Sequence, residues 1–215
     1  MRTNPAFVAW LSACLVASAV SSAQAECAVM MNGDGSYETG YQWEGIDVQP
    51  PYFGAFAECF SGTGSVCGVV LDLTCNGDNI PFLDIYVWQD DGGAPGPVVA
   101  VSTGHDPAPV DFWPSVSRHA FPLEYAVSVG GTWWAGFWGD WPGATSSWFV
   151  GADSSGGDSG CPVTNVAPGL EWPAGWQPVP LVFGETTALG IGVEFEEGAT
   201  PVRSRSWGEI KRVFR

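Results

Sequence analysis

The sequence has almost no basic residues over most of its length. Between Arg2 and Arg203 the only Lys or Arg is Arg118, whereas the segment from Glu26 to Glu197 holds 22 Asp and Glu. Binding to nucleic acid requires Lys and Arg side chains that neutralise the phosphates. The composition therefore excludes nucleic acid as a partner of this segment.

Histidine is also scarce, with His105 and His119 as the only two. Residues 157–162, GDSGCP, resemble the nucleophile segment of chymotrypsin-type serine proteases, in which the serine needs a histidine base. Neither histidine lies in the histidine-loop sequence of that family, and Cys161 stands where the family has a second glycine. We therefore expect no protease activity. We also expect that the protein has no catalytic residues and is not an enzyme.

The cysteines lack the C-x2-C spacing of structural zinc sites, so we do not expect them to bind a metal. An extended GVVLDLT segment between Cys67 and Cys75 spans roughly 25 Å, far beyond the ~6 Å that a disulfide allows. Cys59 and Cys67 flank the flexible segment FSGTGSV, and we predict a disulfide between them. The number of cysteines after residue 25 is odd, so one of them has no partner within the chain.

No apolar run is long enough for a confident membrane span of about 20 residues. The apolar stretch from Ala6 to Val20 follows Arg2 and precedes Ala23-Gln24-Ala25, an arrangement typical of a secretory signal peptide over residues 1–25. We expect a secreted or cell-surface protein with no membrane span after cleavage. An alternative is lipidation at Cys14, because Leu11-Ser12-Ala13-Cys14 resembles a bacterial lipobox.

What is abundant indicates an all-β body over residues 26–197. The chain holds 29 Gly and 17 Pro, which favour short strands and tight turns. Alternating apolar residues predict an antiparallel β-sandwich, jelly-roll-like in type. We expect strands at 69–73, 82–88, 98–102, 121–129, 132–138, 147–150, 181–183 and 189–196. Residues 151–180 show no strand pattern and are predicted to form a long loop.

Twelve tryptophans are the main indication of a ligand. Alternation along residues 132–138 places Trp134 and Trp138 on the face opposite Trp133 and Phe137. A row of partly exposed indoles could stack on sugar rings, and we predict such a ligand surface at Trp88, Trp134, Trp138 and Trp141. The alternative is that both faces are covered and the tryptophans serve packing.

Calcium is the most plausible inorganic ligand of so acidic a body. Asn32 to Glu38 places oxygen ligands at alternate positions around glycines, as in a fragment of an EF-hand loop, and Asp90-Asp91 precedes two glycines. We therefore name Asp34, Asp90 and Asp91 as candidate ligands of a structural calcium ion. The alternative is a set of solvated turns.

The chain ends in a short basic segment that differs from the body. Five of the seven Lys and Arg lie in the last thirteen residues. We interpret residues 198–205 as a linker and residues 206–215 as a short helical tail, begun by a capping box of Ser206 and Glu209. So short a helix is unstable alone, so the tail should dock on its own body or on another protein. The expected docking residues are Trp207, Ile210, Lys211, Phe214 and Arg215.

Four segments of the body, YQWEGIDVQPPYFGAFAECF, VWQDDGGAPGPVVAV, FWPSVSRH and GFWGDWPGA, resemble a family of uncharacterised secreted bacterial proteins. The ending SWGEIKRVFR is similar to the W-G-x-I-K-x-x-[FY]-R tails of such exported proteins. The resemblance covers roughly residues 37 to 215. It implies export in a bacterium, a β-sandwich body and a tail recognised by sorting machinery, and it implies no activity.

Together these observations favour a secreted or cell-surface β-sandwich that binds glycan or a surface polymer without catalysis. A second hypothesis is a structural or envelope protein whose tryptophans are core and whose tail is a sorting label. A secreted hydrolase ranks third, because carboxylates for a glycosidase pair are plentiful.

Overall fold

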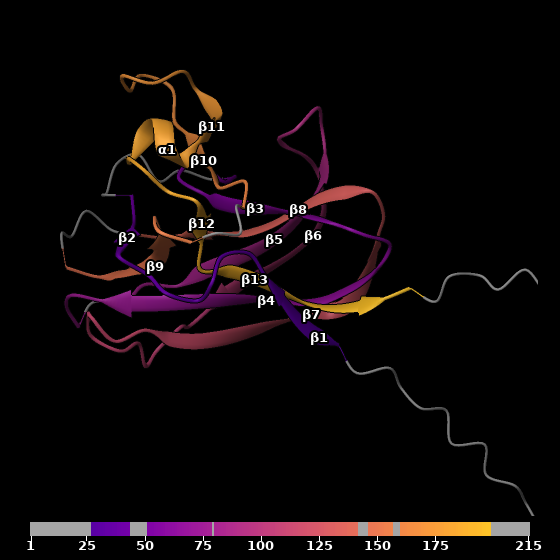
Figure 1. The fold of residues 1–215 in the computed structure, drawn as a ribbon, viewed down its shortest axis with the longest axis horizontal. Coiled ribbons are helices and arrows are strands. Elements are labelled where there is room, and N and C mark those ends of the chain that lie inside the picture. The colour runs from indigo at the N-terminus through magenta and orange to yellow at the C-terminus, as the bar shows by residue number, and fades with distance from the viewer. Residues whose placement is uncertain (1–26, 44–50, 79, 142–145, 157–159, 199–215) are drawn as a thin grey trace, which may run out of the picture.

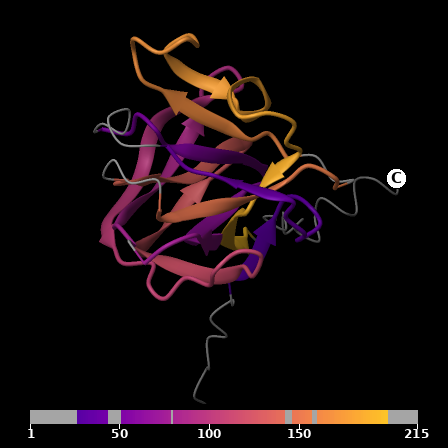
Figure 2. The same cartoon turned by 90° about the vertical axis from the view of Figure 1, so that its left-hand side faces the viewer.

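The computed structural model describes residues 27–43, 51–78, 80–141, 146–156 and 160–198. These residues form two antiparallel β-sheets packed face to face, as Figures 1 and 2 show from two directions. The strands are β1 (Ala28–Met31), β2 (Thr39–Tyr41), β3 (Phe56–Ser61), β4 (Gly64–Cys75), β5 (Leu83–Asp90), β6 (Pro95–His105), β7 (Ser117–Val129), β8 (Thr132–Gly139), β9 (Trp148–Asp153), β10 (Val163–Val166), β11 (Gly175–Pro178), β12 (Ala188–Leu189) and β13 (Ile191–Glu197).

The first sheet has the strand order β1-β13-β4-β9-β12, with β7 paired to β4 and β2 paired to β9. The second sheet has the order β11-β10-β3-β8-β5-β6. The sequence-based prediction of an all-β antiparallel sandwich is therefore confirmed. Neighbours in both sheets include strands distant in the chain, such as β1 beside β13, which no local pattern could indicate.

Alternating apolar residues explain why these segments pair and why they face each other. On β4, Val69, Leu71 and Leu73 are fully buried, and on β13 the same is true of Ile191 and Val193. Side chains at alternate positions of a strand point to the same face. These faces, with their counterparts in the second sheet, form one central hydrophobic core between the sheets.

Two expectations about the strands are wrong. Residues 151–180 are not one long loop, because they contain β10 and β11, which form an antiparallel hairpin. β10 also pairs with β3 and so joins the hairpin to the second sheet. Residues 181–183 are not a strand, because the short helix α1 (Val179–Val182) covers most of them. Pro180 cannot donate to a β-ladder, whereas the first turn of a helix tolerates a proline.

The predicted disulfide between Cys59 and Cys67 is also wrong. Cys67 pairs with Cys27 at a Cα–Cα distance of 6.6 Å, and Cys59 pairs with Cys161 at 5.6 Å. The error has a topological cause, since β3 and β4 do not form a hairpin but belong to opposite sheets. As expected, Cys67 and Cys75 do not pair, and Cys75 is a free, buried thiol.

Several predictions concern residues outside the described ranges. These are the signal peptide over residues 1–25, lipidation at Cys14, most of the linker and the whole tail, including Trp207, Ile210, Lys211, Phe214 and Arg215. Among the described residues, no helix has the length and apolar character needed to cross a membrane.

Candidate functional site

The outer face of the second sheet carries a cluster of aromatic residues separate from the central core. On β8, Trp133 and Phe137 belong to the central core, whereas Trp134 belongs to this outer cluster and Trp138 packs against it. Trp88 on β5 joins them there. The alternation predicted for residues 132–138 is therefore confirmed.

The predicted open row of tryptophans is nevertheless wrong. Trp88, Trp134 and Trp141 have exposed fractions of 0%, 2% and 1%. Trp141 does not lie on the outer face at all, because it packs in the central core against Phe137 and Trp148. Stacking on a ligand needs an open ring face, which these three indoles lack, so these three residues are structural. Their burial could not be foreseen from alternation, which gives the face of a side chain but not what covers it.

Two segments cover the outer tryptophans. The turn before β3 places Tyr52 edge-on against Trp88 at 6.0 Å between ring centroids, and β11 places Trp176 edge-on against Trp88 at 5.3 Å. Trp138 is half-buried, and its Nε1–H donates a 2.9 Å hydrogen bond to the carbonyl of Phe53. The buried tryptophans thus support a second aromatic layer that is itself partly exposed.

This second layer lines an open cleft of about 410 Å³, which we call the Tyr52–Trp176 cleft. Its size lies within the range of small-molecule sites, roughly 300–1,000 Å³. Its walls come from the turn before β3, the start of β6 and the β10–β11 hairpin. The lining includes Pro51, Tyr52, Phe53, Pro95, Asn165 and Trp176.

The two aromatic rings of the cleft lie close to parallel. Their centroids are 6.2 Å apart with an interplanar angle of 20°. Both rings are half-buried, so each presents part of its surface to solvent. Tyr86 and Trp88, which stack on each other at 5.1 Å, lie against them from the sheet side. The rings therefore rest on a rigid base, and the cleft is largely formed without a ligand.

Asn165 supplies an unusual polar group in this cleft. It lies directly opposite Trp176 in the β10–β11 ladder, so both side chains emerge on the same face. Its backbone is fixed by hydrogen bonds to Ala55 and from Gly54, at 2.9 and 2.7 Å. The side chain is only 4% exposed, yet its Oδ1 has no hydrogen-bond partner among the described residues. Because buried polar atoms are nearly always paired, this amide points to a ligand or an ordered water.

The sequence did not reveal Tyr52, Asn165 or Trp176. Tyr52 lies in a Pro-rich turn, and Trp176 follows Pro173 and Gly175 in what looked like a loop. Only the pairing of β10 with β3 and β11 brings these residues to one place. The available signal was the aromatic content of both segments.

Two of the candidate calcium ligands, Asp34 and Asp90, accept hydrogen bonds within turns of the described structure. Asp34 Oδ1 accepts hydrogen bonds from the Ser36 N–H at 2.8 Å and the Ser36 hydroxyl at 2.6 Å, which lowers the pKa of Asp34. Asp90 accepts from the Gly93 N–H and from Trp134 Nε1. Within the described ranges no three potential ligand side chains form a metal-sized cluster. Calcium binding at Asp34, Asp90 and Asp91 stays a prediction.

Each of the two histidines is hydrogen-bonded to a serine. His105 Nε2 hydrogen-bonds the Ser102 hydroxyl at 2.9 Å, and His119 Nε2 hydrogen-bonds the Ser117 hydroxyl at 2.8 Å. Burial lowers the pKa of both histidines. Ser159 of the protease-like segment lies outside the described residues, while Cys161 of that segment is bonded to Cys59.

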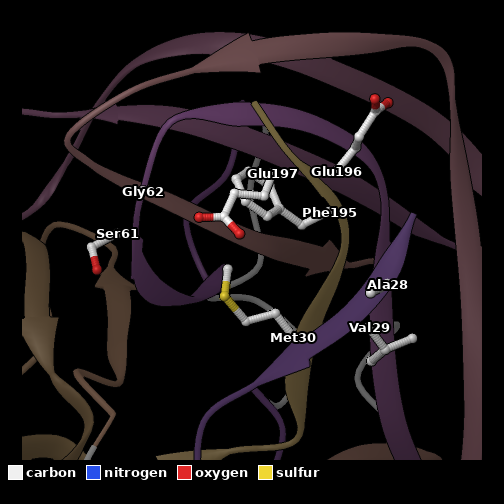
Figure 3. Close-up of a pocket in the computed structure, with 8 residues that line it drawn as sticks. All are labelled: Ala28, Val29, Met30, Ser61, Gly62, Phe195, Glu196 and Glu197. Atoms are coloured by element: carbon white, nitrogen blue, oxygen red, sulfur yellow. The ribbon is translucent and has the colours of Figure 1, made fainter. Parts of the chain in front are cut away.

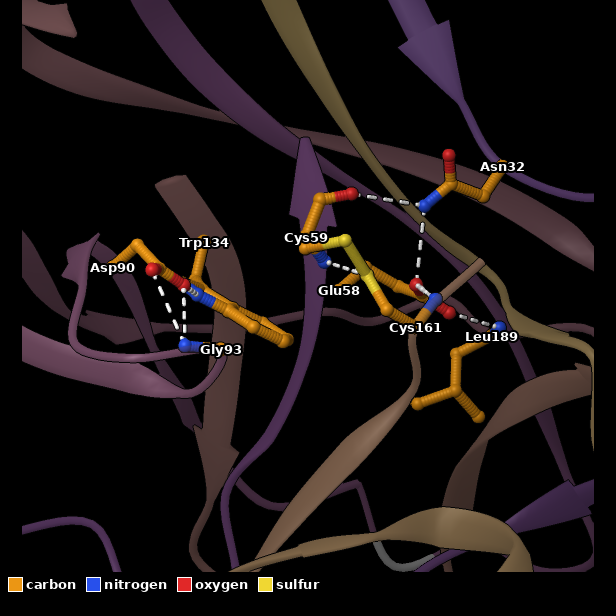
Figure 4. Close-up of a disulfide and its surroundings, with 8 residues drawn as sticks. All are labelled: Asn32, Glu58, Cys59, Asp90, Gly93, Trp134, Cys161 and Leu189. Atoms are coloured by element: carbon orange, nitrogen blue, oxygen red, sulfur yellow. Dashed lines mark hydrogen bonds between the residues drawn. A yellow bond between two sulfur atoms is a disulfide. The ribbon is translucent and has the colours of Figure 1, made fainter. Parts of the chain in front are cut away.

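A buried carboxylate lies beside that disulfide (Figure 4). Glu58 is fully buried and accepts hydrogen bonds from Asn32 Nδ2 at 3.0 Å, the Cys161 N–H at 2.9 Å and the Leu189 N–H at 2.7 Å. Burial raises the pKa of Glu58 to about 7, against the opposing effect of these hydrogen bonds. No ligand can reach a carboxylate enclosed in this way, so its perturbed pKa indicates a structural group.

No protein-family model matches the chain, and no curated protein or solved structure is significantly similar to it. The function must therefore be argued from the site alone.

Proposed function

We propose that the folded body is a non-catalytic domain that binds glycan, either free or as part of a surface polymer, in the Tyr52–Trp176 cleft. The observation that carries this proposal is a cleft walled by two nearly parallel, half-buried aromatic rings, with the unpaired Oδ1 of Asn165 in its lining. An amide can both donate to and accept from a sugar hydroxyl. The apolar face of a pyranose ring can pack on an indole or phenol ring.

The lack of positive charge in the cleft limits the class of sugar that it can bind. Arg118 is the only Lys or Arg among the described residues. It lies on the first sheet, away from the cleft, and its guanidinium donates hydrogen bonds to Asp72 of the same sheet. The described residues therefore offer no cation in the cleft to bind a sulfate, phosphate or uronate group. A neutral sugar fits this chemistry better than an acidic one.

Location outside the cytoplasm is part of the same proposal. The signal-like residues 1–25 support export, and the two disulfides agree with an oxidising compartment. The resemblance to secreted bacterial proteins supports the same location.

A glycan array probed with the mature chain tests the proposal. We expect binding to a set of neutral oligosaccharides, lost in the double variant Tyr52→Ala/Trp176→Ala. The matched control is Trp113→Ala, because Trp113 is an exposed tryptophan, 41% exposed, that contacts Phe149 of the first sheet and not the cleft. Absence of wild-type binding to any glycan, or equal binding by the double variant, would refute it.

A further inference from the structure

A second cavity lies at the edge of the first sheet, where the described chain both begins and ends. It has a volume of about 530 Å³ and lies between β1, the end of β13 and the turn after β3. Figure 3 shows its lining, which includes Val29, Met30, Ser61, Phe195, Glu196 and Glu197. We call it the Phe195 groove.

The groove combines an apolar surface with an acidic rim. Met30 and Phe195 are half-buried and lie on one face of the sheet, whereas Val29, on the opposite face of the same edge strand, is 50% exposed. Phe195 is held in place by stacking on Trp133 of the core at 5.6 Å. Glu197 adds a carboxylate on the side of β13 that carries Phe195, and Glu196 adds one on the opposite side of the same edge. No described Lys or Arg lies against either carboxylate, because Arg118 is bound to Asp72. The groove thus fits a basic segment that also carries large apolar side chains.

We propose that the chain's own basic tail, residues 206–215, docks in the Phe195 groove. The tail carries three basic side chains and one acidic side chain, Glu209. Its apolar residues Trp207 and Phe214 match the apolar surface, and Lys211, Arg212 and Arg215 match the carboxylates. This proposal concerns a surface distinct from the glycan cleft and does not depend on it.

The place where the described chain ends favours this occupant over a separate protein. β13 ends at Glu197, which itself lines the groove, so the linker that leads to the tail begins at the rim of the proposed docking site. The nine residues from Gly198 to Ser206 can span up to ~30 Å, more than the reach needed. A short tether also gives the tail an effective concentration at the groove in the millimolar range, so even a weak interaction keeps the groove occupied.

Docking has a structural consequence for β1, which is the outermost strand of the first sheet. A free edge strand exposes unpaired backbone groups that favour aggregation. The docked tail covers Val29 and shields this edge.

Lys211 is the only lysine in the chain, which allows a direct test. Carbodiimide treatment of the mature chain joins an amine to a carboxylate without a spacer, and mass spectrometry identifies the pair. We expect Lys211 to be joined to Glu196 or Glu197 in monomeric protein, with the yield falling at ~1 M salt because screening weakens the attraction.

Proximity along the chain alone could also favour these two carboxylates, so the test needs a variant that removes docking but keeps the charges. The double variant Trp207→Ala/Phe214→Ala leaves the body and Lys211 intact, and we expect a several-fold lower yield. Val29→Ser should lower the yield as well, whereas Val98→Ser, at a similarly exposed valine of β6, should not. An unchanged yield in the tail variant, no cross-link from Lys211, or cross-links spread to Glu124 and Glu171 would overturn the proposal.

Discussion

The Glu58 carboxylate accepts a hydrogen bond from the backbone N–H of Cys161, the residue that is disulfide-bonded to Cys59, the neighbour of Glu58. Gly160 leaves room for this contact, because a Cβ there would lie 2.5 Å from Glu58 Oε2. The hydrogen bond from the Leu189 N–H links the same carboxylate to β12 of the opposite sheet. A single buried acid therefore joins β3, β12 and the segment leading into β10.

This carboxylate should make stability depend on pH. Folding raises the pKa of Glu58 from its ordinary value of 4.5 to about 7, mainly through burial, so the folded state binds the proton more tightly. Its contribution is fully present below pH 4.5 and is lost as pH rises through 7, by up to about 3 kcal/mol. Urea unfolding of the wild type between pH 4.5 and 7.5, in ~1 M salt to screen the surface carboxylates, should show this fall.

Glu58→Gln is the matching variant, because it removes the titration. We expect the fall in stability with rising pH to disappear in this variant, whose remaining pH dependence comes from His105 and His119 and has the opposite sign. Glu124→Gln, at an exposed acid of β7, should keep the wild-type slope. The same profile in the wild type and in Glu58→Gln would contradict this assignment.

The disulfide pattern predicts which cysteine reacts with an alkylating reagent. In the absence of reductant, Cys75 should be unreactive in the native protein because it is buried, and in denaturant it should become the only one of the five described cysteines to be labelled. Peptide mapping by mass spectrometry reads this out. Labelling of Cys27, Cys59, Cys67 or Cys161 under these conditions would show that the pairing is different.

The isolated arginine should stabilise the fold through one buried acid. Arg118 donates from Nε and Nη2 to the Asp72 carboxylate, both at 2.7 Å, and the Tyr37 hydroxyl donates to the same group at 2.6 Å. Asp72 is only 4% exposed. Arg118→Ala leaves this carboxylate with fewer donors and should cost about 2 kcal/mol in urea unfolding.

A double-mutant cycle with Asp72→Asn provides the control. The cost of Arg118→Ala should shrink markedly when Asp72 is already an amide, since the two residues act as a pair. A cost below about 0.5 kcal/mol in the wild-type background would mean that the pair behaves like an ordinary surface salt bridge.

The sequence predicted the strands whose burial alternates and failed where topology decides. The segment around Leu83, Ile85 and Val87 shows its inner face directly, and it lies on β5 as expected. By contrast, β10 has four buried residues, Val-Thr-Asn-Val, with no alternation to read. The β10–β11 hairpin was therefore missed, and with it the partners of Trp88 and Trp134.

The candidate site shows the same division. Alternation placed Trp134 and Trp138 on the outer face, because the side-chain period of a strand is a local property. It could not show that Tyr52 and Trp176, which are 124 positions apart in the chain, meet over them. Cys161 likewise finds Cys59 only because β10 pairs with β3.

The central claim is that Trp176 and Asn165 bind a sugar in the Tyr52–Trp176 cleft. Isothermal titration calorimetry tests it most directly. The oligosaccharide that binds best on the array is titrated into the wild type and into the variants Trp176→Ala, Asn165→Ala and Trp113→Ala. We expect Trp176→Ala to weaken binding by about 2 kcal/mol, or ~30-fold, and Asn165→Ala to weaken it as well, with Trp113→Ala unchanged. Wild-type affinity in both cleft variants, with their folds intact, would contradict the account.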